Sequence, residues 1–330
     1  MLERLCIALL FLLLAIPALA QEPTEPAEPT PDIILVPGQR PGPGLWKVAK
    51  GDHVLWIFGT YGPLPQNMAW RSQEVEAILA QSQEYLLPPS ATASVGFFRQ
   101  LTLLPYAIGF KKNPDGARLV DLVPAEVYAR WLLLKQKYIG DDDGIERERP
   151  IFAAQTLYSK GLQKAGLSAG NDLRKTIEQL VKKNHLKMTP SNVTLAMDDP
   201  VGAIKDFKKS ALDDVPCFAK TLDSLETDIN DLRIRANAWA KGDLDLIAKL
   251  NFAERENACA AALSNSAFTR NRPQFQDVQQ RMGAAWMATA EKSLAANRST
   301  FAILPLKELL DPKGVLAALQ AKGYEVRNPD

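Results

Sequence analysis

The chain has few of the side chains that catalytic centres use most often. Its 330 residues include two histidines, His53 and His185, and three cysteines, Cys6, Cys217 and Cys259. With so few histidines, a two-His metal site or a serine nucleophile activated by a base has almost no candidates. The sequence also has no phosphate-binding loop and no dinucleotide-binding fingerprint. We therefore expect no metal and no cofactor.

An excess of charge of one sign is also missing. The chain carries 39 Lys and Arg residues against 38 Asp and Glu residues, a formal net charge of +1. Proteins that bind nucleic acid neutralise its phosphates with a basic surface, and here no basic stripe with interleaved aromatic residues occurs. The composition therefore predicts no nucleic-acid partner.

Long hydrophobic runs are rare, and the clearest one lies at the start, from Leu5 to Leu19. It follows a single positive side chain, Arg4, and ends in small residues of the kind that a signal peptidase reads. A membrane span needs about 20 apolar residues, and this run is shorter. We interpret residues 1–20 as a signal peptide cleaved near Ala20-Gln21, with an uncleaved anchor as the alternative. The mature chain is then expected to be periplasmic or secreted and to have no transmembrane segment.

Residues 21–44 are rich in proline and glutamate. This composition cannot build a core and predicts a disordered linker. The apolar run Ile33-Ile34-Leu35-Val36 interrupts it and could dock as an edge strand.

Export would leave Cys217 and Cys259 as the remaining cysteines. Two cysteines in an oxidising compartment usually pair. Both lie in helix-like stretches rich in alanine and leucine, so we expect a disulfide between two helices. Two buried free thiols are the alternative.

The clearest local pattern runs from Gly44 to Leu87. Two apolar and β-branched runs, residues 45–48 and 54–58, flank the polar turn Lys50-Gly51-Asp52-His53 and predict a β-hairpin. The second strand ends in Gly59-Thr60-Tyr61-Gly62.

Ser72 is a predicted N-cap for the helix that follows, and Tyr85-Leu86-Leu87 predicts a further strand. From Leu45 to Ser82 this layout resembles the TraB/GumN family, also called Tiki-like, whose members open with LWxV, a strand ending in GTxH and a helix beginning WxSxxV. The resemblance implies an α/β fold and a metal-dependent hydrolase centre made from two Gly-x-x-His motifs and a strand-end Glu. In this chain Gly62 stands at the first His position and Pro88 at the Glu position.

The C-terminus resembles the same family. A strand at 301–304, the start of a helix at 314–319 and the closing Gly323-Tyr324-Glu325-Val326 all match. Between them Pro305-Leu306-Lys307-Glu308 occupies the second Gly-x-x-His motif, so Glu308 replaces the His.

Two shorter matches lie between these ends, at Trp239–Asp243 and at Arg270-Asn271. Arg270 and Asn271 could equally cap a helix, and Arg71 could simply pair with Glu74.

The middle of the chain, about residues 120–296, is mostly helical by pattern. We expect helices at 124–138, 151–165 and 172–184, and a dense series over 214–296. Val193-Thr194-Leu195-Ala196 predicts a central strand. Strands separated by helices indicate an α/β fold, here one domain over 45–330 with a central mixed β-sheet and a large helical insertion.

The two remaining histidines do not restore the lost chemistry. His53 belongs to the predicted hairpin turn and His185 follows a Lys-rich helix end, so neither is expected at a strand end that faces a cleft.

Two functions remain open. The first is a non-catalytic member of the family that binds or scaffolds a protein or peptide in the cell envelope. The second is a hydrolase of peptidase or esterase type with a remodelled, metal-independent centre. The two motif loops are expected to line one cleft at the C-terminal ends of neighbouring strands. The candidate residues of that cleft are Gly59, Thr60, Tyr61, Gly62, Arg71, Pro88, Arg270, Asn271, Lys307 and Glu308.

Overall fold

The computed structural model describes residues 43–66, 68, 70–94, 97–168, 171–226, 229–249 and 254–329. They all belong to one compact unit. The expected signal peptide and residues 21–42 of the expected linker, including the Ile33–Val36 run, lie outside the described residues.

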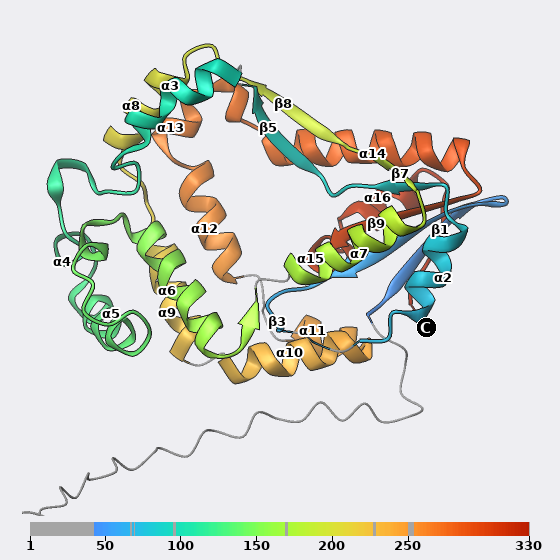
Figure 1. Cartoon of the computed structure of the whole chain (residues 1–330), viewed down its shortest axis with the longest axis horizontal. Helices are drawn as coiled ribbons and strands as arrows, with labels where there is room; N and C mark the ends of the chain where they lie inside the picture. The colour runs from blue at the N-terminus through green and yellow to red at the C-terminus, as the bar shows by residue number, and fades with distance from the viewer. Residues whose placement is uncertain are drawn as a thin grey trace, which may run out of the picture. The chain divides into compact units, whose positions relative to one another are not determined.

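A mixed six-stranded sheet lies on one side of this unit, to the right in Figure 1. Its strands lie in the order β10-β1-β2-β9-β4-β7. Their bounds are β1 (Leu45–Lys50), β2 (His53–Thr60), β4 (Glu84–Leu86), β7 (Lys187–Thr189), β9 (Ser299–Pro305) and β10 (Glu325–Arg327). The α/β fold predicted from the sequence is confirmed.

The hairpin of β1 and β2 is antiparallel, with Leu45 opposite Phe58 and Lys50 opposite His53. β9 then pairs with β2 in parallel, which places Thr60 opposite Pro305. β4 and β7 extend the sheet in the same direction as β9. The sheet is therefore parallel from β2 through β9 and β4 to β7, whereas β10 pairs antiparallel with β1. Parallel strands need both faces covered by other elements.

Helices provide this cover. The long helix α14 (Val278–Ala296) packs on β2, β4 and β9, while α2 (Gln73–Gln81) packs on β9 and on α7 (Asn171–Lys183). α10 (Ile229–Lys241) and α11 (Leu244–Lys249) add Trp239 and Ile247 to the same core. The predicted helix after Ser72 is confirmed as α2, although the Ser72 hydroxyl bonds to Glu76 and not to the helix backbone.

Helices from the middle of the chain form a second core. α5 (Ala125–Tyr138), α6 (Pro150–Lys164) and α9 (Val215–Glu226) bury a cluster that includes Trp131, Leu157 and Phe218. α4 (Leu119–Leu122) packs on α5, and α12 (Glu254–Ser264) packs on α9. α3 (Phe97–Ala107), α8 (Pro200–Lys209) and α13 (Ala267–Arg270) are grouped together at the top left of Figure 1. None of the described helices is long and apolar enough to cross a membrane.

The strand predicted at 193–196 exists but is not central. β8 (Asn192–Ala196) pairs only with β5 (Ser90–Ser94), in a separate two-stranded ladder. Asn192, Thr194 and Ala196 are exposed, whereas Leu195 is buried. The run is short and alternates between exposed and covered positions, so it fits a half-exposed ribbon better than a strand covered on both faces.

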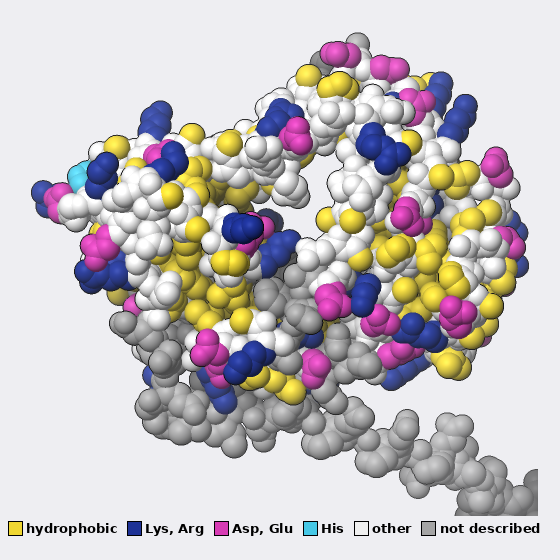
Figure 2. Space-filling model, turned by 180° about the vertical axis from the view of Figure 1, so that it is seen from behind, with side chains coloured by type: hydrophobic (Ala, Val, Ile, Leu, Met, Phe, Trp, Pro, Cys, Tyr) yellow, Lys and Arg dark blue, Asp and Glu magenta, His cyan; other side chains and the backbone are white. Residues whose placement is uncertain are grey.

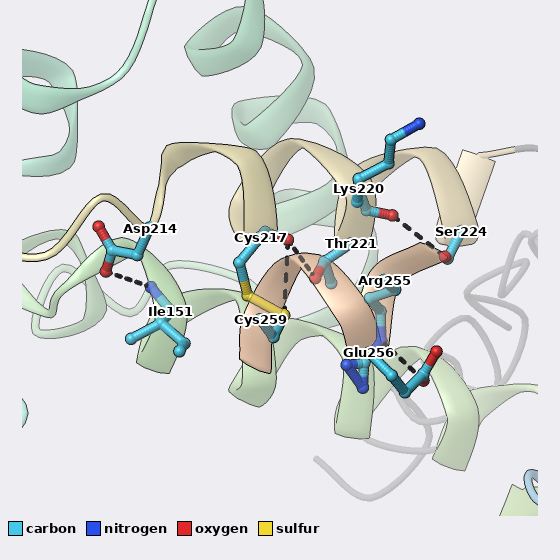
Figure 3. The surroundings of a disulfide bond; sticks show 9 residues. All are labelled: Ile151, Asp214, Cys217, Lys220, Thr221, Ser224, Arg255, Glu256 and Cys259. Atoms are coloured by element: carbon cyan, nitrogen blue, oxygen red, sulfur yellow. Dashed lines mark hydrogen bonds and ion pairs between the residues drawn. A yellow bond between two sulfur atoms is a disulfide. The ribbon is translucent and has the colours of Figure 1, made fainter. Parts of the chain in front are cut away.

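The predicted disulfide is confirmed. Cys217 of α9 and Cys259 of α12 are bonded, with their Cα atoms 4.5 Å apart. Figure 3 shows the two helices side by side at this bond. Next to it, the buried carboxylate of Asp214 accepts a hydrogen bond from the backbone N–H of Ile151 at 2.9 Å, which holds the start of α6 against α9.

A buried carboxylate forms hydrogen bonds to several residues at the end of the sheet where β4, β7 and β9 begin. Glu84, the first residue of β4, accepts hydrogen bonds from Lys187 Nζ at 2.8 Å, from Asn297 Nδ2 at 2.6 Å and from the Thr189 hydroxyl. Burial alone raises the pKa of Glu84, but these donors outweigh it and lower the pKa from 4.5 to about 2. No local pattern in the sequence predicts this network.

The disulfide predicts a measurable loss of stability when it is removed. Cys217→Ala with Cys259→Ala should lower the free energy of unfolding by about 3–4 kcal/mol, because a bond across 42 positions restricts the unfolded chain. Urea unfolding measures this loss, and the reduced wild-type chain should show the same loss. Two free thiols per unreduced, unfolded chain from Gln21 onward would contradict the bond.

The Glu84 network predicts a stability that depends on pH. A carboxyl group with a depressed folded pKa contributes its full stabilisation above its unfolded pKa and loses it as the pH falls towards the folded pKa. The wild type should therefore lose roughly 3 kcal/mol between about pH 5 and pH 2, relative to Glu84→Gln, which has no carboxyl group there. An equal pH dependence of unfolding in both proteins would show that Glu84 is not held ionised.

Candidate functional site

The two motif strands end side by side. The Thr60 hydroxyl donates to the Leu304 carbonyl at 3.1 Å, and Trp239 Nε1–H donates to the Gly59 carbonyl at 2.9 Å. A Cβ on Gly59 would lie 2.7 Å from the Trp46 ring and 3.0 Å from Leu306, so this motif position accepts no side chain without rearrangement. Gly59, the glycine of the first motif, therefore has a role in packing.

After β9 the chain turns at once into α15 (Leu306–Leu310), which exposes Lys307 and Glu308. These two side chains line a groove of about 640 Å³ together with α14 and the beginning of α16 (Val315–Ala321). Pro88, Met282 and Met287 also line it, and its surface is mostly apolar. We call it the α14–α15 groove. It brings together three of the sequence-predicted positions, Pro88, Lys307 and Glu308.

The first motif loop lines a different cavity. Tyr61 and Gly62 border a small cavity of about 60 Å³ whose other walls come from α6, α9, α10 and α12. These walls carry charges of both signs, among them Arg255, whose guanidinium lies 3.7 Å from the centre of the Tyr158 ring. Burial raises the pKa of Tyr158. Gly62 and Glu308 therefore line separate cavities although their strands are neighbours.

The other predicted positions lie elsewhere. Arg71 precedes α2, and Arg270 and Asn271 stand at the end of α13; all three are outside the lining of both cavities. Arg270 Nη1 donates to the Asn265 carbonyl at 2.6 Å, and the Asn271 N–H donates to the Ala267 carbonyl at 3.0 Å. Both residues thus stabilise a helix end.

A metal centre of the kind that the family resemblance implies does not fit these residues. Three motif positions would supply the metal ligands. Gly62 and Pro88 have no side-chain atom that can bind a metal, and Glu308 has one carboxylate. Within the described ranges, no group of three His, Cys, Asp or Glu side chains is placed to hold an ion.

Neither histidine compensates for these losses. His53 is the first residue of β2, at the end opposite Thr60, with its Nε2 3.6 Å from Asp52 Oδ1. His185 is exposed after α7 and adopts a left-handed backbone conformation with φ of 55°.

One possible nucleophile lies outside the motif positions. Ser168 is the middle residue of Gly166-Leu167-Ser168-Ala169-Gly170, which has the Gly-x-Ser-x-Gly spacing of a hydrolase nucleophile. It ends β6 (Leu167–Ser168), which pairs with β3 (Leu64–Pro65), and α7 begins three residues later. Ser168 lines a cavity of about 140 Å³ with Asp172. Among the described residues that line this cavity, none is a histidine that could activate the serine.

Comparison with known proteins agrees with the resemblance seen in the sequence. Residues 44–328 match the TraB/PrgY/gumN family, a span that covers all the described strands and helices. No curated protein and no solved structure was found to match the chain. The chain belongs to the TraB/PrgY/gumN family.

Proposed function

We propose that this chain is an exported, non-catalytic member of its family that binds a protein or peptide partner in the cell envelope. The binding surface in this proposal is the α14–α15 groove. The observation that carries the proposal is the pair of motif strand ends, which keep their packing but present Gly62 and Glu308 to separate cavities.

The chemistry of the groove suits binding better than reaction. Pro88, Pro89 and Pro305 lie in its wall, and proline has no backbone N–H, so this wall has few of the donors that stabilise an oxyanion. Met282 and Met287 contribute flexible, polarisable side chains that adapt to different apolar partners. Lys307, Glu308 and Lys313 give the groove charged groups that could orient a partner.

Two observations support export. The first twenty residues have the composition of a signal peptide. The Cys217–Cys259 disulfide is of the kind that persists in oxidising compartments such as a periplasm or the extracellular space.

The alternative, a remodelled hydrolase, would need polar groups to converge around a substrate. Glu308 and Lys307 share the groove, but Tyr61 lines the other cavity and Arg270 caps a helix. The described geometry therefore favours the binding proposal.

Filling the groove tests this proposal. Gly283 lies on α14 in the groove wall, and no atom lies within 4 Å of the place where its Cβ would be. Gly283→Trp should fold normally, because glycine is a poor helix former, yet it should occupy the groove. We expect roughly tenfold weaker binding of anilinonaphthalene sulfonate, an apolar anionic dye, which corresponds to about 1.4 kcal/mol.

Ala288→Trp is the matched control, because Ala288 is exposed on the same helix but outside the groove lining. It should bind the dye as the wild type does. Equal dye binding by wild type and Gly283→Trp, with unchanged circular dichroism, would show that the groove is not an open binding surface.

A further inference from the structure

Helix α5 exposes apolar side chains that are not buried in either core. Its inner face buries Val127, Trp131 and Leu134 against the second core. On its outer side, Leu133 is 74% exposed and Leu132 is 45% exposed. Figure 2 views the molecule from behind, so α5 lies on its right-hand side. Hydrophobic side chains gather on that side.

These side chains form a continuous stripe. Successive helical residues are about 100° apart, so Ala125, Ala129, Leu132 and Leu133 fall on one side of the helix, and all four are exposed. We call these four residues the α5 outer face. Leu122 of α4 is also exposed just before it. An apolar stripe of this length on a soluble protein usually marks an interface.

The charges beside the stripe have opposite signs at its two ends. Glu126 lies in the first turn of α5 and Lys137 in the last turn, and both are exposed. Their signs complement the helix dipole, which accounts for the charges but not for the exposed leucines. Among the residues that the structure describes, neither forms an ion pair with another side chain, and Lys137 Nζ lies 5.2 Å from the centre of the Tyr138 ring.

This pattern is complementary to itself in one orientation. If two copies of α5 pack antiparallel about a two-fold axis, Glu126 of each copy approaches Lys137 of the other. The small Ala129 then lies opposite Leu132 and Leu133 of the second copy. A parallel arrangement would place like charges together. A two-fold interface requires a surface that fits itself in this way.

A membrane surface fits the stripe less well. Helices that lie on membranes carry an excess of Lys and Arg beside their apolar face. Here Asp121 and Glu126 flank the apolar residues, and Arg130 is already bound to Asp223 and Glu226.

We propose that the exported chain forms a two-fold dimer in which the α5 outer faces of two copies pack antiparallel. Glu126 and Lys137 pair across the axis, and Leu132 and Leu133 are buried against the alanines of the partner. No residue of α5 lines the α14–α15 groove, so this interface is independent of the proposed binding site.

Sedimentation equilibrium of the chain from Gln21 onward tests the dimer. The wild type should have twice the mass of one chain at micromolar concentration, and Leu133→Lys should be a monomer. Ile108→Lys is the control, because Ile108 is 75% exposed after α3, away from α5, and its replacement should leave the dimer intact.

Charge exchange tests the orientation. Glu126→Lys and Lys137→Glu should each weaken the dimer by about tenfold, or about 1.4 kcal/mol, because each places like charges together. The double variant restores both pairs, so its dissociation constant should return to that of the wild type. Restoration is expected only if the two residues meet across the axis.

A wild type that stays monomeric up to about 100 µM, far above the micromolar affinities of ordinary complexes, would overturn the proposal. A dimer that is unchanged by Leu133→Lys and by the charge variants would also overturn it. So would a monomeric wild type that sediments with phosphatidylglycerol vesicles when Leu133→Lys does not.

Discussion

The parallel pairing of β2 with β9 is the contact on which the rest of the structure depends. It joins Thr60 to the carbonyl of Leu304, 244 positions further along the chain, so nearly the whole helical insertion is a loop closed by these two strands. Phe58 and Phe301 stack across the pair, with Tyr85 of β4 on the far side of Phe301. Closing so long a loop costs conformational entropy, and the buried aromatic core beneath the pair offsets that cost.

The same pairing accounts for the packing of the motif framework. Gly59 is enclosed by Trp46 and Leu306, and its carbonyl is bound by Trp239. Leu306 and Leu309 of α15 are buried in the core, which fixes where Lys307 and Glu308 emerge. These positions serve the fold, whereas Gly62, Pro88 and Glu308 lie at the surface or only partly covered, where substitution costs little stability.

Local patterns in the sequence were enough to predict the hairpin and the helices α2, α5, α6 and α7, because each has its own periodicity and turn residues. The C-terminal strand was expected from the resemblance to the family. The disulfide followed from the number of cysteines and the expected export. The position of β8 did not follow, because a short apolar run does not reveal how many of its faces are covered. The Glu84 network was also missed, since its partners lie 103 to 213 positions away and leave no local pattern.

The candidate site could be predicted only in part, because contacts between residues far apart in the sequence leave no local pattern. The sequence places Gly62 and Glu308 at neighbouring strand ends, but the helices that wall their cavities come from the insertion and from α14. We propose that this framework does not support hydrolysis. The most direct test of this proposal is the rate of peptide and ester hydrolysis by the purified wild type and by Glu308→Ala, with zinc, manganese or cobalt supplied. We expect no rate above buffer for either protein, whereas wild-type turnover that disappears in Glu308→Ala would show that the site is catalytic.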